Sequence, residues 1–183
     1  MVSPDVERAP LPPGGGARFL LEALVAGSPI ANPGVKFPPP FLFVAGFLVG
    51  WLIHRQWPVP LLPRASARVC EVAGWAALAM GLGVILWAFA TFLRRRTAIY
   101  PNQPATQIVR DGPYRWTRNP MYLSLTSMYL GLALLINSVV PILVLPVVLI
   151  LLVSLVIRRE ERYLQAAFPG EYGAYCADVR RWL

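Results

Sequence analysis

The chain has 183 residues, of which 56% are hydrophobic and 14% are charged, whereas about a quarter of the residues in soluble domains are charged. Two stretches, 72–93 and 119–157, carry no charged residue, and each is long enough to cross a bilayer as a helix of about 20 residues. An ordinary soluble domain is excluded, because one core of this size cannot bury so much uninterrupted apolar chain.

The net charge of +8 does not indicate nucleic acid as a partner, because all 17 Lys and Arg residues lie outside the two charge-free stretches. Their clustering at the ends of apolar segments is typical of contact with anionic headgroups, and we find no helix-turn-helix or zinc-finger pattern. Cys70 and Cys176 are too far apart for a CxxC motif, and the single histidine, His54, cannot form a His-rich metal site. We therefore expect neither nucleic acid nor a metal.

The first 36 residues are predicted to lie outside the membrane. Residues 1–16 are rich in Pro and Gly, and no signal peptide is recognisable. Residues 17–28 are expected either to form a short helix on the membrane surface or to be a loosely packed turn. Residues 37–183 are predicted to form one integral membrane domain.

Two spans are predicted in the first half of this domain. The first follows three consecutive prolines and covers 41–57, and the second covers 70–93. In the second span, Ala73, Ala77 and Gly81 recur at four-residue intervals and predict a small-residue face for close helix packing.

The long charge-free stretch predicts two further spans, over 120–136 and 139–160. Asn137-Ser138 is its best turn signal, and a short turn there produces a tight antiparallel hairpin. The predicted fold is therefore all-α: a polytopic membrane helix bundle of about four transmembrane helices, the last two forming the hairpin.

The distribution of basic residues predicts the orientation. With four spans, the N-terminus, the 94–119 loop and the C-terminal tail share one side, and only Arg55, Arg64 and Arg68 lie on the other. Fourteen of the 17 basic residues are then on one side, which predicts that the loop and the tail face the cytoplasm.

The cytoplasmic loop contains the string TAIYPNQPATQIVRDGPYRWTRNPMY. Asp111-Gly112-Pro113 is predicted to be a turn, and Asn119-Pro120 reads as the N-cap and first residue of the third span. The amides at this helix start suit a carboxylate or another acceptor group. The aromatic residues nearby also fit a simpler interpretation, as ordinary anchors at the membrane interface.

The tail continues from the fourth span as IRREERYLQAAFPGEYGAYCADVRRWL. Glu160 and Glu161 lie at the end of that span, beside Arg158 and Arg159. They are either part of a solvated helix end or, if one of them turns inward, part of a functional site. Spacing alone leaves both alternatives open.

The strings GPYRWTRNPMY and REERYLQAAFPGEYGAY, separated by an apolar hairpin, resemble the signature of the isoprenylcysteine carboxyl methyltransferase and phospholipid methyltransferase superfamily. That signature is written R-H-P-x-Y-x-G followed by E-E. The resemblance extends over 33–183 and includes GVKFPPPFLFVAGFLVG, as in bacterial members. It implies a methyltransferase that uses S-adenosyl-L-methionine, with a cytoplasmic cofactor-binding loop and a C-terminal helix, in a bacterial inner membrane. No G-x-G-x-x-G unit supports a Rossmann-type domain.

The resemblance also implies which residues form the site. The cofactor would be held by Gln103, Thr106, Gln107, Ile108, Val109, Tyr114, Asn119, Pro120, Tyr122 and Glu160. Arg158 or Arg159 would face the acceptor, and Glu161 or Glu160 would serve as the base that an amine acceptor requires. Asn119 departs from the His of the eukaryotic enzymes, and Ser124 from their Gly, which marks a different subfamily.

The acceptor implied is a lipophilic small molecule or lipidated substrate from the bilayer. The residue types suit either a carboxylate, which arginine grips with two donors, or an amine, which needs a base. Carboxyl O-methylation of an isoprenylcysteine-like substrate is favoured by the arginine pair beside the two glutamates and by the closer resemblance of the tail to the carboxyl methyltransferases. The alternative is N-methylation of a phospholipid amine. A hypothesis outside the enzymes is a non-catalytic membrane scaffold or lipid-binding protein. Such a protein would not require both of the two strings, which together are called the double motif.

Overall fold

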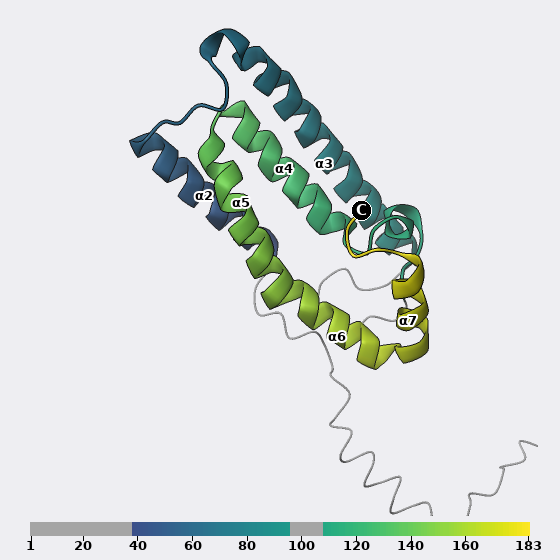
Figure 1. Cartoon of the computed structure of the whole chain (residues 1–183). Helices are drawn as coiled ribbons and strands as arrows, with labels where there is room; N and C mark the ends of the chain where they lie inside the picture. Colours follow the sequence, from purple (N-terminus) through teal and green to yellow (C-terminus); the bar gives the residue numbers. More distant parts are fainter. Residues whose placement is uncertain (1–37, 96–107) are drawn as a thin grey trace, which may run out of the picture.

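The computed structural model describes residues 38–95 and 108–183, and it is helical apart from short connections (Figure 1). The helices are α2 (Pro40–Gln56), α3 (Ala67–Arg95), α4 (Pro120–Leu135), α5 (Val139–Leu152), α6 (Arg158–Ala167) and α7 (Pro169–Asp178). Within these residues β-pairing is confined to an isolated bridge between Pro60 and Ser138. The expected all-α class is therefore confirmed for this part of the chain.

Several predictions fall on the rest of the chain. The N-terminal segment 1–36, with its helix over 17–28, and the predicted cofactor residues Gln103, Thr106 and Gln107 lie outside the described residues.

Two helical stretches are long and apolar enough to cross a membrane, Arg64–Arg95 and Val139–Ala167. Helices α2 and α4 are apolar but shorter, with 17 and 16 residues. The predicted boundaries of α2 and α4 agree with the structure to within a residue. Four spans remain a prediction.

The turn between α4 and α5 is the one predicted. Asn137 has a φ of 47°, in the left-handed region that asparagine tolerates. The Ser138 side chain caps α5 by accepting a hydrogen bond from the Val140 amide at 3.3 Å. Asn137 also bonds both backbone groups of Leu62, at 3.0 and 2.8 Å. The turn therefore also holds the α2–α3 connection against this end of the bundle.

The fourth helix does not end at residue 160 as predicted. It continues through a π-helical segment, Val153–Ile157, into α6, and ends at Ala167, with Phe168 as its C-cap before Pro169. The prediction treated the first charged residues as the end of the helix. Arg, Glu, Leu, Gln and Ala are all good helix formers, so the helix continues after it leaves the apolar stretch.

Helices α3 and α4 pack with their backbones in contact. A Cβ built on Gly131 would lie 2.8 Å from the carbonyl oxygen of Gly74, which no real side chain tolerates. The predicted four-residue repeat is wrong at Ala73, which is exposed, whereas Gly74, Gly81 and Ala88 are buried. A seven-residue period follows one face of a helix, whereas a four-residue step drifts by about 40° each time.

The helices are arranged with α4 and α5 between α2 and α3 (Figure 1). Helix α2 packs on α5, where Gly46 and Gly50 approach Val148 and Pro141. One buried cluster lies along α2, α4, α5 and the π-helical segment and comprises Phe43, Tyr129, Leu145, Val148, Leu152, Val156 and Ile157. Helices α6 and α7 project beyond one end, and the C-terminus returns to the start of α4 (Figure 1).

Candidate active site

The loop before α4 packs against the end of α3. Gly112 has a φ of 55°, which favours glycine, and it begins a 3-10 turn, Gly112–Arg115. Tyr114 is buried there against Phe92, with ring centroids 5.1 Å apart in an edge contact. The predicted turn is thus confirmed, and it fixes where α4 begins.

Tyr114 and Val109 lie in one buried cluster with Ala88 of α3. The Tyr114 carbonyl accepts a hydrogen bond from the Tyr175 hydroxyl of α7 at 2.6 Å. Burial raises the pKa of both tyrosines above the ordinary value, so both hydroxyls stay neutral. Ile108, the neighbour of Val109, packs instead in the cluster formed by α7. Of the predicted cofactor residues in this loop, Val109 and Tyr114 therefore pack toward α3, whereas Ile108 packs toward α7.

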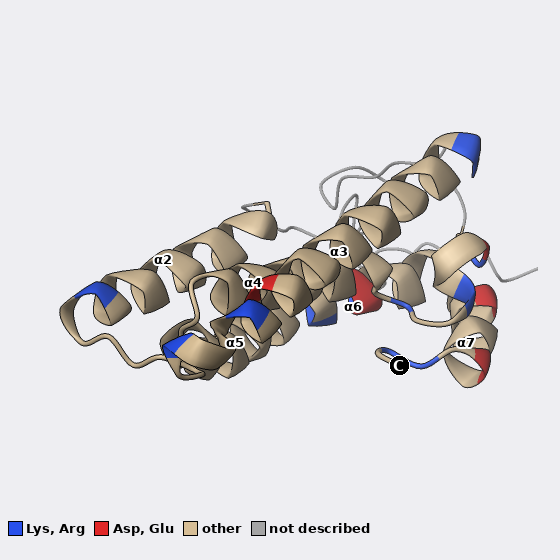
Figure 2. Ribbon diagram, turned by 90° about the horizontal axis from the view of Figure 1, so that it is seen from above, with Lys and Arg blue, Asp and Glu red and all other residues tan. Residues whose placement is uncertain are grey.

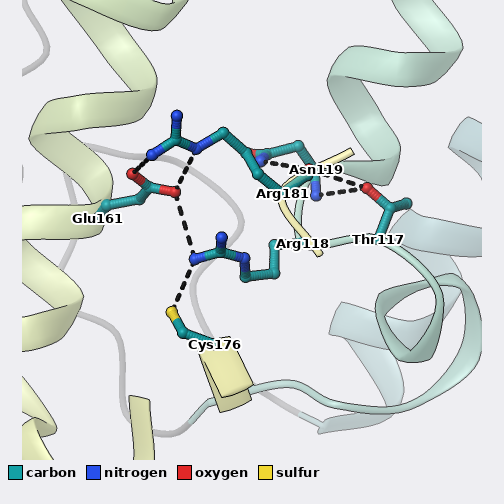
Figure 3. A network of polar contacts seen from close by, with 6 residues as sticks. All are labelled: Thr117, Arg118, Asn119, Glu161, Cys176 and Arg181. Carbon is teal, nitrogen blue, oxygen red and sulfur yellow. Dashed lines mark hydrogen bonds and ion pairs between the residues drawn. The ribbon is translucent and has the colours of Figure 1, made fainter. Parts of the chain in front are cut away.

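Asn119 and Pro120 occupy the N-cap and first positions of α4, as predicted. The Asn119 side chain does not cap the helix. Its Nδ2 donates to the carbonyl of Arg181 at 3.0 Å, and its backbone amide donates to Thr117 Oγ1 at 3.2 Å (Figure 3). The first-turn amides of α4 therefore lack a side-chain acceptor from the N-cap.

The two motif segments meet where the first turn of α4 comes close to α6. The Tyr122 hydroxyl donates to Glu160 Oε1 at 2.7 Å, and both side chains are partly buried. This contact joins residues 38 positions apart in the sequence. Glu160 therefore turns inward, toward the start of α4.

Glu161 points in another direction, toward the C-terminal residues (Figure 3). Arg181 holds it with two hydrogen bonds, from Nε at 2.9 Å and from Nη2 at 2.6 Å. Arg118 Nη1 lies 3.4 Å from Oε1 of the same carboxylate and 2.7 Å from Cys176 Sγ. Each oxygen of Glu161 is therefore engaged by a cation.

This network contains residues that sequence reasoning missed. From the sequence, Arg118 and Arg181 contribute only to the basic charge predicted for the cytoplasmic side, and Cys176 only to the absence of a CxxC motif. The available signal for Arg118 is its position directly before the Asn119-Pro120 pair of the motif. The Arg118 amide donates to the Arg180 carbonyl at 3.0 Å, so the end of the chain is attached to the motif by backbone and side chain alike.

The residues Arg158 and Arg159 lie on different sides of α6. With 3.6 residues per turn, Arg159 is about 100° from Glu160 around the helix, and Arg158 about 160° from it. Arg158 lines a pocket together with Glu161. Arg159 is partly buried and lies nearer the Glu160 side.

The profile of the family described as phospholipid methyltransferase matches residues 69–171, more than half of the chain. The chain belongs to the phospholipid methyltransferase family. The resemblance found in the sequence is thereby confirmed, and with its apolar helices the chain is an integral membrane protein. The matched region includes Tyr122 and both glutamates but ends before Arg181.

The chain is also similar to one curated protein, the cobalt-zinc-cadmium resistance protein CzcN of Cupriavidus metallidurans. The two are 33% identical over 99 residues, which is 54% of this chain and 45% of that protein. The similarity therefore covers less than half of the length of that relative. No solved structure matches the chain.

Proposed function

We propose that this member of the phospholipid methyltransferase family transfers a methyl group from S-adenosyl-L-methionine to a membrane-resident acceptor. The contact between Tyr122 and Glu160 supports this proposal, because it unites the two family motifs at one end of the bundle. A scaffold would need the hairpin but not this inward carboxylate, which is costly to place at a membrane boundary.

The residues present fit the cofactor. The uncapped amides at the start of α4 suit its carboxylate, and Glu160 Oε2, which accepts no hydrogen bond within the described part of the chain, suits its amino or hydroxyl donors. When bound, the cofactor supplies an electrophilic methyl group on a positively charged sulfur. The protein would hold donor and acceptor in line and exclude water from the site.

The direction in which each residue points from α6 suggests its role in the reaction. We assign the acceptor-facing role to Arg159, because it lies nearer the Glu160 side, and not to Arg158. Glu161, expected as a base, has both oxygens engaged by Arg181 and Arg118, so its proposed role is to position the C-terminal residues. A base for an amine acceptor would then be Glu160.

The product of the reaction tests the proposal. With radiolabelled cofactor and native membrane lipid extract, the full-length protein is expected to transfer label to a lipid-soluble acceptor. For an isoprenylcysteine-like carboxylate, mild alkali should release the label as methanol, because methyl esters hydrolyse and N-methyl groups do not. Base-stable label in the phospholipid fraction would favour the amine alternative. Absence of both transfer and cofactor binding would support a scaffold.

The orientation is a separate prediction, based on the excess of basic residues at the α6 end. In a background with Cys70→Ala and Cys176→Ser, we compare Ala65→Cys and Gln165→Cys, two exposed positions at opposite ends of the helices. An impermeant maleimide applied to sealed cells is expected to label the first position at once and the second after permeabilisation. The reverse order of labelling would show that the site faces outward.

A further inference from the structure

A second polar feature lies on the face of α6 that carries Glu161. It is a pocket of about 650 Å³ between α6, α7 and Arg118, the residue before the N-cap of α4. Its walls include Arg118, Arg158 and Arg162, with Glu161 as the carboxylate among its lining residues. None of the residues assigned above to the cofactor lines it. This arginine pocket is therefore separate from the Tyr122–Glu160 contact.

The charge in the arginine pocket is not balanced within the described residues. Glu161 is shared between Arg118 and Arg181, so it cannot neutralise the remaining arginines. The Arg158 side chain has no hydrogen bond or ion pair within the described part of the chain, and Arg162 Nε donates to the backbone carbonyl of Arg158 at 3.2 Å. An anion in the pocket would meet several guanidinium groups, which bind phosphate and carboxylate oxygens well.

Arg118 provides an independent indication of a ligand. Its side chain is 16% exposed, and its Nε is buried with no hydrogen-bond partner among the described residues. Buried donors are nearly always satisfied, so each exception needs an explanation such as an absent ligand. The opposite side of this guanidinium is occupied, since Nη1 contacts Glu161 and Cys176.

The approach to the arginine pocket is apolar. Leu143 is 69% exposed, Val147 56% and Leu151 41%, and these residues recur every four positions along α5. Ser154, three residues further, lines the pocket, and Arg158 follows after four more. Residues three or four apart share a helix face, so a lipid-facing stripe leads directly to the arginines. Helix α5 contains no charged residue. Figure 2 shows Lys and Arg in blue at one end of α2 and at one end of α3.

From this combination we infer that the arginine pocket binds the phosphate of an anionic phospholipid whose chain lies along α5. Free phosphate would use the same guanidinium groups, but it would leave the apolar stripe without a role. Anionic lipids concentrate at the cytoplasmic leaflet, where basic residues near the surface attract them. The bound lipid would contact α6, α7 and Arg118 together, and so would connect the leaflet with the segment that precedes α4.

Lipid retention by the full-length protein tests this inference. The protein is purified in neutral detergent, mixed with phosphatidylglycerol or phosphatidylcholine of matched chains, and the retained lipid is counted by native mass spectrometry. We expect phosphatidylglycerol to be preferred at least about fivefold, the selectivity that one surface cation provides. Equal retention of the two lipids by the unmodified protein would overturn the inference.

Matched variants locate the site. Arg158→Gln with Arg162→Gln should abolish the preference, whereas Arg64→Gln with Arg68→Gln removes the same charge from exposed positions at the other end and should retain it. An equal loss in the two pairs would show that general charge, not this pocket, is responsible. Should the first pair fail to fold, Arg158→Lys with Arg162→Lys must keep the preference. Full displacement of phosphatidylglycerol by equimolar glycerol phosphate would overturn the choice of a lipid.

Discussion

Glu160→Gln is expected to weaken binding of S-adenosyl-L-methionine at least about tenfold, or about 1.4 kcal/mol, because one charged hydrogen bond is replaced by a neutral one. The substitution keeps the shape of the side chain and its hydrogen bond from Tyr122, so the helix contact is preserved. Calorimetric titration of the full-length protein in detergent measures the affinity. Unchanged affinity in folded variant protein would contradict the assignment of Glu160 to the cofactor.

A matched control separates this effect from a general loss of charge. Glu171→Gln removes one negative charge from an exposed position on α7, at the same end of the molecule. Its affinity for the cofactor should equal that of the unmodified protein. If both variants weaken binding equally, long-range electrostatics would explain the result and the carboxylate of Glu160 would have no direct role.

Gly131→Val is expected to lower the free energy of unfolding by about 1–3 kcal/mol, the usual cost of forcing extra atoms into a closely packed interface. The new side chain would meet the Gly74 carbonyl oxygen and the backbone of Leu78, so α3 and α4 would have to separate. Thermal unfolding in detergent, followed by circular dichroism, should show a lower midpoint than for the unmodified protein.

Gly83→Val provides the control, because a Cβ at Gly83 meets no atom within 4 Å. The two substitutions carry the same change in helix propensity, so the difference between them reports packing alone. Equal midpoints for the two variants would contradict the close backbone contact between α3 and α4.

Several features of this protein follow from the sequence by itself, since they depend on local chemistry. The charge-free stretches determine the helices, because a chain in lipid must satisfy its backbone hydrogen bonds internally. Asn137 tolerates the left-handed turn and Ser138 caps the next helix, so the hairpin could be predicted from two neighbouring residues. The double motif likewise placed the chain in its family.

Other features were decided only by the tertiary structure. Glu160 and Glu161 are adjacent and chemically identical, yet one contacts Tyr122 and the other Arg181, because each step along a helix turns the side chain by about 100°. Which direction faces α4 depends on how α6 packs, after a π-helical segment that no local pattern predicted. Contacts between residues 118, 161 and 181 are long-range, so only the folded chain brings this charge network together.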